Sequence, residues 1–321
     1  MESVFRVVVV GVGHLGQHHA RILSTLDNVD LIGVIDIDRD RAKRISSEYG
    51  TDVIEDIGSA LGRVDGVIVA VPTQDHLLVT APLLEAGVSV LVEKPIASSS
   101  LEADVLLRTA KNSGATLAVG HTERHNPAVV TARALISSPG FIEVHRLSTF
   151  RSRSLDIDVV FDVMIHDIDI VLSLVGSNPV SVEAVGIPVL TDRVDIANAR
   201  LRFTNGCIAN LTASRISREQ VRKLRVFEPH ALVTVDYAEQ QLEAWRVTKS
   251  KDGSPSVHGG PVEVVTVEPL ECEIRDFVNS VRNGIEPGVT GAAGRQALVV
   301  AESITNAMED TNRLSKVDRM P

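Results

Sequence analysis

Cysteine is scarce in this sequence, and it has no long apolar runs. The two cysteines, Cys207 and Cys272, lie far apart and form no Cys-x-x-Cys pair, so neither a disulfide framework nor a thiolate zinc site is indicated. We interpret both as reduced core residues. No stretch approaches the roughly 20 apolar residues that a membrane-spanning helix needs. The first apolar run, residues 7–10, is too short for a secretory signal, so we expect a cytoplasmic protein without membrane insertion.

Basic residues are outnumbered by acidic ones. The chain has 32 lysines and arginines against 42 aspartates and glutamates, which gives a formal net charge of -10. This balance repels phosphate backbones and anionic membrane surfaces, so nucleic acid is not an expected partner. We interpret the basic run at residues 218–225 as charges that protect an exposed strand edge.

The length of 321 residues favours two domains. Up to about residue 120, consecutive β-branched residues alternate with helical patterns, which predicts a doubly wound parallel sheet in a Rossmann-like α/β domain over residues 1–122. Over residues 123–321, polar and apolar residues alternate and turn formers such as Asn205-Gly206 join the segments. This pattern predicts an α/β domain with an open, mainly antiparallel sheet. A late helix over about 291–308 could pack back on the first domain.

A glycine-rich turn follows the first predicted strand. Gly11, Gly13 and Gly16 occur in the order G-x-G-x-x-G at the start of a helix, which favours a tight turn, a close approach to a pyrophosphate and close packing of helix on strand. The amino end of that helix attracts phosphate. Asp36 ends the next strand and can accept the ribose hydroxyls of adenosine, which favours NAD. Arg39 keeps NADP open as the less favoured cofactor, because an arginine there can pair with a 2′-phosphate.

The stretch VEKPIA places Glu93 and Lys94 at the end of the fifth strand-like run. Open α/β sheets bind their ligands at this edge. A lysine ammonium there can stabilise the alkoxide that forms as an alcohol loses its hydride, or it can act as the base. The alternative interpretation is a lysine in a surface turn.

Residues 161–171, FDVMIHDIDIV, place charged side chains in an apolar stretch. At about 100° per residue, Asp162, His166 and Asp169 share one narrow sector of a helix, and apolar residues fill another. Asp162 precedes His166 by four residues, so it can orient the imidazole and make it a better general base. A solvated helix face and a metal site are the alternatives. The metal site is disfavoured because no His-x-x-x-His pair or cysteine cluster is present.

Together with GVGHLGQHHA, VPTQDH and GHTERHNPAV, these motifs resemble the Gfo/Idh/MocA family of sugar and cyclitol oxidoreductases nearly end to end. The resemblance implies a Rossmann domain, a C-terminal sheet that forms homodimer or homotetramer contacts, and a catalytic set of Lys94, Asp162 and His166. Whether Lys94 or His166 is the base stays open. The predicted cofactor contacts come from the glycine loop and the following strand ends: Gly11, Gly13, His14, Leu15, Gly16, Asp36, Pro72, His76, Glu93 and Lys94.

Within that family, GHTERHNPAV and STFRSRSLDIDVVFDVMIHDIDIVLSLV are most similar to enzymes that oxidise the 3-hydroxyl of UDP-N-acetylglucosamine with NAD. A diphosphate needs counter-charge, and we expect it from Arg124, Arg151 and Arg153 unless they form a solvated face. His121 and Asn126 are further candidates for contacts with the substrate, beside Asp162 and His166. The alternatives are a dehydrogenase of myo-inositol or another free sugar, and a non-catalytic NAD-bound regulator.

Overall fold

The computed structural model describes residues 4–150, 157–250 and 253–317. The chain divides into two compact units. The first unit contains the chain up to residue 122 together with residues 268–295, and the second contains residues 123–267 together with the chain from residue 296 onward. In the described part of the chain, no helix combines the length and the apolar character that crossing a membrane requires.

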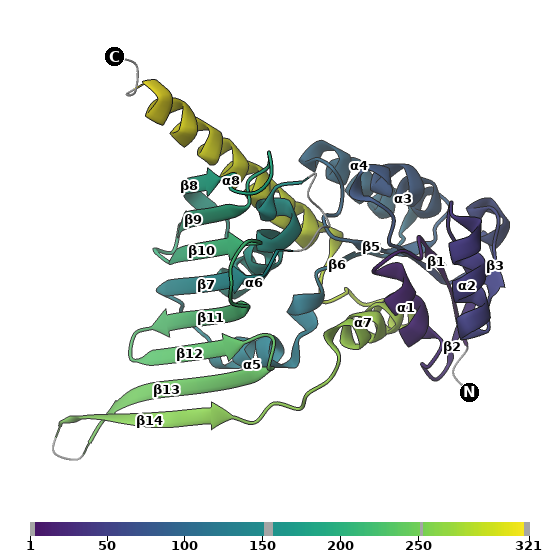
Figure 1. The fold of residues 1–321 in the computed structure, drawn as a ribbon. Helices are drawn as coiled ribbons and strands as arrows, with labels where there is room; N and C mark the ends of the chain where they lie inside the picture. Colours follow the sequence, from purple (N-terminus) through teal and green to yellow (C-terminus); the bar gives the residue numbers. More distant parts are fainter. Residues whose placement is uncertain (1–3, 151–156, 251–252, 318–321) are drawn as a thin grey trace. The chain divides into compact units, whose positions relative to one another are not determined.

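The first unit is built on a six-stranded parallel sheet, as the sequence predicts (Figure 1). Its strand order is β3-β2-β1-β4-β5-β6. The central strands are buried along their whole length because helices pack against them. The strands are β1 (Phe5–Val10), β2 (Val29–Ile35), β3 (Asp52–Val53), β4 (Gly66–Val69), β5 (Ser89–Glu93) and β6 (Leu117–Gly120). The helices between them are α1 (Gly16–Leu23), α2 (Arg39–Tyr49), α3 (His76–Glu85) and α4 (Ser100–Ser113), with short 3-10 turns η1 (Ile57–Ala60) and η2 (Thr73–Asp75).

Helix α7 (Pro269–Asn283) belongs to the first unit. The sequence predicts that residues 268–295 lie in the second domain, and the structure differs because one face of α7 is apolar. Ile274, Phe277 and Val278 pack in the same cluster as Phe5 of β1. The Phe5 and Phe277 rings meet edge to face, with centroids 6.3 Å apart.

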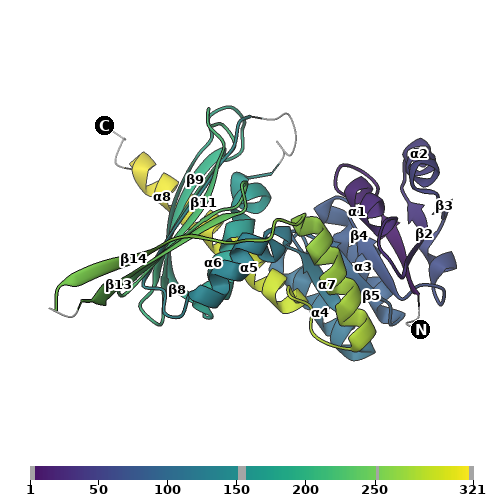
Figure 2. The same cartoon turned by 90° about the horizontal axis from the view of Figure 1, so that it is seen from below.

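The second unit contains an eight-stranded, mainly antiparallel sheet, which agrees with the predicted fold class. The strand order is β14-β13-β12-β11-β7-β10-β9-β8, and β7 and β10 run parallel. Alternate residues of β7 and β9 are buried because helices cover one face of the sheet; Figure 2 shows α5 and α6 on the same side of the sheet. The strands are β7 (Phe141–Leu147), β8 (Pro179–Ile187), β9 (Ile196–Phe203), β10 (Ile208–Ser214), β11 (Val221–Glu228), β12 (Ala231–Asp236), β13 (Gln241–Lys249) and β14 (Pro255–Val262). The helical segments are η3 (Thr122–His125), α5 (Pro127–Leu135), η4 (Val160–Met164), α6 (Ile165–Val175) and α8 (Gly291–Val317).

The late helix is longer than predicted, and its residues divide between the two units. Residues up to 295 of α8 belong to the first unit. There, Gly291 and Gly294 lie close to β6: a Cβ on Gly291 would lie 2.9 Å from the Leu117 side chain, and a Cβ on Gly294 would lie 2.6 Å from the Val119 side chain. From residue 296 onward, α8 contributes Ala297, Ile304 and other apolar residues to the core of the second unit.

The basic run at residues 218–225 does not protect a sheet edge, so that interpretation is wrong. Most of it forms β11, which pairs with β12 on one side and β7 on the other. Its charged residues face outward between buried apolar ones and pair across the strands instead. Lys223 lies 3.7 Å from Asp236, and Arg225 lies 3.2 Å from Glu143.

The structure also bears on the predicted turn at Asn205-Gly206 and on the two cysteines. Gly206 has a φ of +86° in the turn between β9 and β10, which confirms the Asn205-Gly206 turn. Cys207 is a buried free cysteine, whereas Cys272 is free but only partly buried.

Candidate active site

The glycine loop between β1 and α1 has the shape that a dinucleotide phosphate requires. Gly11 has a φ of +83°, and a Cβ there would lie 2.6 Å from the Ala70 carbonyl oxygen. A Cβ on Gly16 would overlap the backbone of Gly11. At Gly13, by contrast, a Cβ would meet only the Arg41 guanidinium, at 3.9 Å. Gly11 and Gly16 are therefore required by packing, while Gly13 leaves the backbone open to a phosphate. His14 and Leu15 are exposed in the same loop.

Asp36 follows β2 and holds a nearly buried carboxylate beside this loop. It accepts the backbone N–H of Val12 at 2.9 Å and that of Asp38 at 2.8 Å. Arg41 contacts it at 3.3 Å, whereas Arg39 pairs with the exposed Glu55 at 3.8 Å. Sequence reasoning missed Arg41, although its place in the first turn of α2, five residues after Asp36, is a readable signal. The carboxylate of Asp36 is an acceptor that fits the ribose hydroxyls of a dinucleotide, which donate to it.

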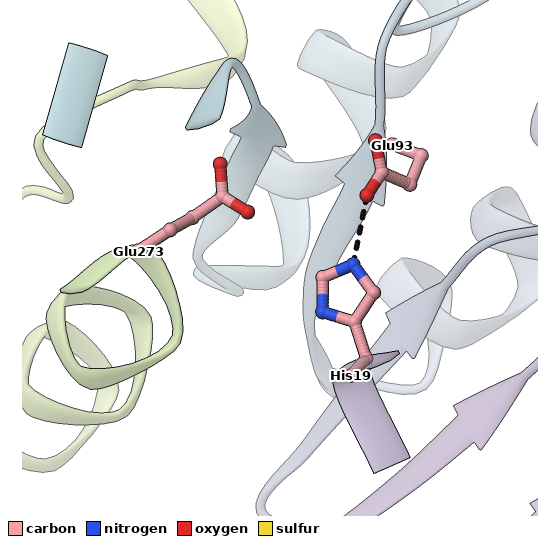
Figure 3. Close-up of side chains that lie close together, drawn as sticks. All are labelled: His19, Glu93 and Glu273. Atoms are coloured by element: carbon pink, nitrogen blue, oxygen red, sulfur yellow. Dashed lines mark hydrogen bonds and ion pairs between the residues drawn. The ribbon is translucent and has the colours of Figure 1, made fainter. Parts of the chain in front are cut away.

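Lys94 follows the last residue of β5, and the carboxylate of Glu93 anchors its backbone. The Lys94 N–H donates to Glu93 Oε2 at 3.2 Å. Glu93 Oε1 lies 2.7 Å from Nε2 of the buried His19 (Figure 3). Burial acts to raise the pKa of Glu93, but the hydrogen bond and charge of His19 and the charge of Lys94 hold that pKa below its ordinary value. Glu93 is therefore an ionised group that lies against Lys94.

His76, the first residue of α3, is buried and contacts two backbone carbonyls. Its Nδ1 lies 2.8 Å from Pro95 O, and its Nε2 lies 3.0 Å from Val71 O. Burial lowers the pKa of His76, although these carbonyls and the charge of Glu93 act in the opposite direction. Its ring therefore joins the loop after β4 to the turn after β5. The cofactor contacts predicted for His76 and for the exposed Pro72 stay predictions.

One group among the described residues brings three possible metal ligands together. His19, Glu93 and Glu273 of α7 are buried, and one ligand atom from each lies within 4.8 Å of the others (Figure 3). Thr122 Oγ1 donates to Glu273 Oε2 at 3.3 Å. Two ligands of one tetrahedral zinc lie roughly 3.3 Å apart, given Zn–ligand distances near 2.0 Å. The 2.7 Å contact of His19 with Glu93 is shorter and has the length of a direct hydrogen bond.

The predicted catalytic helix begins with a π-helical turn, η4, before α6 continues as a regular α-helix. Asp162 lies in the π turn, and His166 lies in the first turn of α6; both are half-buried. The sequence predicts regular α-helical spacing across these residues, and the structure differs because i→i+5 bonds widen the turn. Such π turns occur frequently at functional sites.

Two buried ion pairs fix the remaining acidic residues of α6. Asp169 binds Arg124, whose Nε lies 2.7 Å from Asp169 Oδ2. Asp167 binds Arg146 of β7 through bonds of 2.8 and 2.9 Å. Asp169 therefore does not belong to a solvated face. Arg124, one of the three arginines predicted to bind a diphosphate, is already paired with it. Sequence reasoning missed Arg146, although it takes an inward position in the alternation of β7.

The remaining residues predicted to contact the substrate are Asn126, His121, Arg151 and Arg153. Asn126 is buried; it caps α5 by accepting the Ala128 N–H at 3.1 Å, and it donates to Tyr237 O at 3.0 Å. His121 is buried directly after β6. Arg151 and Arg153 lie outside the described residues.

Comparison with known proteins places this architecture in a family. Residues 5–121 match an oxidoreductase family with an NAD-binding Rossmann fold, and residues 128–231 match the GFO/IDH/MocA C-terminal domain. A UDP-N-acetylglucosamine 3-dehydrogenase of Acidithiobacillus ferrooxidans is 37% identical over 95% of this chain and 97% of that protein. An inositol 2-dehydrogenase of Rhizobium meliloti is 26% identical over 97% of this chain and 98% of its own length.

A solved structure has the same fold. The structure of a UDP-N-acetylglucosamine 3-dehydrogenase from Acidithiobacillus ferrooxidans superimposes with a TM-score of 0.89 at 36% identity, and it covers 95% of this chain and 98% of that one. The glycine loop and the Glu93-Lys94-Pro95 turn lie within the first matched region, residues 5–121. This chain belongs to the Gfo/Idh/MocA family of NAD-binding oxidoreductases.

Proposed function

We propose that this protein oxidises the 3-hydroxyl of UDP-N-acetylglucosamine to a ketone with NAD. The observation that carries the proposal is the similarity to the Acidithiobacillus ferrooxidans protein, which is named for that reaction and matches 95% of this chain. The substrate is thus assigned from a relative, whereas the cofactor and the proton transfer are argued from residues of this chain.

The cofactor in this proposal is NAD, with NADP less favoured. The buried carboxylate of Asp36 attracts ribose hydroxyls and repels a 2′-phosphate. Arg41 already pairs with Asp36 and Asp38, which reduces its availability to a 2′-phosphate. Bound NAD supplies the nicotinamide carbon that accepts a hydride. We propose that the glycine loop, Asp36 and the turn after β5 hold the NAD molecule.

We assign the proton chemistry to three residues. His166 takes the proton of the sugar hydroxyl, and Asp162 orients its imidazole ring. Lys94 stabilises the negative charge that develops on the same oxygen. Arg151 and Arg153 supply counter-charge to the diphosphate of the substrate.

The direct test is a steady-state assay of the purified protein. With NAD and UDP-N-acetylglucosamine, we expect NADH absorbance to rise, because the alcohol is oxidised as the cofactor is reduced. The same assay with myo-inositol and free N-acetylglucosamine should give a kcat/KM at least about 100-fold lower, because neither presents a diphosphate. Tight NAD binding without turnover of any sugar would instead identify a regulator.

A free-sugar dehydrogenase is the second candidate, favoured by the similarity to the inositol 2-dehydrogenase. Thermal unfolding in the presence of uridine diphosphate separates the two candidates. A nucleotide-sugar enzyme binds this fragment, and at about 100 times its Kd the ligand stabilises the protein by about 2.7 kcal/mol. The increase in Tm should be absent with uridine alone. Stabilisation by myo-inositol but not by uridine diphosphate would replace the first candidate with the second.

A further inference from the structure

A fully buried histidine outside the proposed reacting groups is bonded to the residue that precedes Lys94. His19 lies on the inner face of α1, and its side chain is 0% exposed. Its Nε2 and Glu93 Oε1 are 2.7 Å apart (Figure 3). Since an ionised carboxylate only accepts hydrogen bonds, the Nε2 atom carries the proton and donates it. A charge-assisted bond of this kind fixes the carboxylate of Glu93 in one orientation.

The second carboxylate oxygen of Glu93 makes a separate hydrogen bond with Lys94. Glu93 Oε2 accepts the backbone N–H of Lys94 at 3.2 Å. A Cβ on the neighbouring Gly120 would lie 2.9 Å from the same oxygen, so the glycine makes room for this carboxylate. A continuous chain of contacts therefore runs from the His19 ring through Glu93 to the Lys94 backbone.

The residues after Lys94 in this turn are held by contacts that do not involve His19. His76 Nδ1 lies 2.8 Å from Pro95 O, the carbonyl of the residue after Lys94. Ile96 and Ala97, which follow, are completely buried. Loss of the His19 contact is therefore expected to release only the Glu93 side of the turn, and the polypeptide around it stays packed.

We infer that His19 is a positioning residue for Lys94 and acts through the carboxylate of Glu93. The inference rests on the proposed function, in which the Lys94 ammonium stabilises the reacting oxygen. The placement of that ammonium matters because a displacement of about 1 Å can lower a rate about 100-fold.

The test compares His19→Leu with two other variants. His19→Gln retains an N–H donor near the position of Nε2. Ile22→Val removes one buried methyl group from the same helix without touching Glu93, and it is the control for mild destabilisation. We expect His19→Leu to lower kcat by about 10- to 100-fold and to raise the KM for NAD by a much smaller factor, because only the turn after β5 is released among the elements proposed to hold NAD. His19→Gln should stay within about threefold of the native kcat.

Hydrogen exchange of the Lys94 amide gives a readout that does not depend on turnover. This N–H donates to Glu93, so we expect it to exchange about 10-fold faster in His19→Leu and at the native rate in Ile22→Val. If His19→Leu does not fold, the double variant His19→Leu/Glu93→Gln tests the same point, because it leaves no unpaired buried charge. That variant should also show the lower kcat and the faster exchange.

Two results would overturn the inference. One is a His19→Leu or double variant whose kcat and Lys94 exchange match those of Ile22→Val, which would make His19 a packing residue only. The other is one equivalent of zinc in the purified native protein that is lost in His19→Leu, which would make the cluster a metal site. A native protein that oxidises no sugar would contradict the proposed function alone, and amide exchange would still decide the role of His19.

Discussion

Lys94→Ala is expected to lower kcat for the sugar by at least about 1,000-fold. Removal of a single group that stabilises an oxyanion costs about 100- to 1,000-fold, and loss of assistance to proton transfer adds to this cost. Lys94 follows β5 directly, and its backbone N–H donates to the ionised carboxylate of Glu93, so the side chain starts from a fixed place at the edge of the sheet. NADH production in the steady state measures the loss.

Two controls separate chemistry from folding and binding. Lys111→Ala removes an exposed lysine from α4 and should leave kcat unchanged. Lys94→Arg retains the charge but spreads it over a planar group, and it should recover little activity. Calorimetric titration with NAD measures the Kd of Lys94→Ala, and because the glycine loop and Asp36 are unchanged, we expect cofactor binding to weaken far less than kcat falls. A Lys94→Ala protein that retains more than about a tenth of the native kcat would refute the assigned role.

The sequence predicts the first unit well because its signals are local. Consecutive apolar residues indicate buried parallel strands, and the glycine spacing identifies the turn between β1 and α1. The same holds for Lys94, since a motif directly after a strand places its side chain at the edge of the sheet. The apolar face of α7 is also readable, but which core it joins depends on residues more than 200 positions earlier, such as Phe5.

The contacts around the predicted residues are much harder to predict. His19 can be recognised as a histidine among inward-facing apolar residues of a helix, yet its partner Glu93 is 74 residues away in the sequence. The inward parity of Arg146 indicates a buried cation, but not that Asp167 meets it. The π turn at Asp162 has no periodic signature, because the pattern of apolar residues remains compatible with an ordinary α-helix.

Arg146→Leu is expected to lower the free energy of unfolding of the second unit by about 3–5 kcal/mol, because it leaves the buried carboxylate of Asp167 without its guanidinium partner. Arg146 is 5% exposed and binds both Asp167 and Glu123, and its guanidinium lies 5.0 Å from the centre of the Tyr237 ring. Burial lowers the pKa of Arg146, but the charges of these two acids outweigh it and raise that pKa above its ordinary value. The loss should follow from removing the guanidinium that donates to both carboxylate oxygens of Asp167.

Denaturant unfolding followed by the fluorescence of Trp245 measures this loss, since the chain has a single tryptophan and it lies in β13 of the second unit. Arg225→Leu is the matched control, because it breaks a half-exposed pair with Glu143 of β7, the strand that also carries Arg146, and should cost at most about 1 kcal/mol. An equal loss of unfolding free energy in the two variants would show that the buried Arg146 pair stabilises the fold no more than the half-exposed pair does.

The difference between Arg146→Leu and the native protein should also depend on pH. Burial raises the pKa of Asp167 even with Arg146 present, and without the guanidinium that pKa rises further. A carboxyl whose pKa is higher in the folded than in the unfolded state binds protons preferentially when folded, so lowering the pH stabilises the variant relative to the native protein. The deficit should therefore shrink as the pH falls from 7 toward about 4. A deficit that stays constant over this range would mean that lost packing of the arginine side chain, and not an unpaired buried charge, causes the instability.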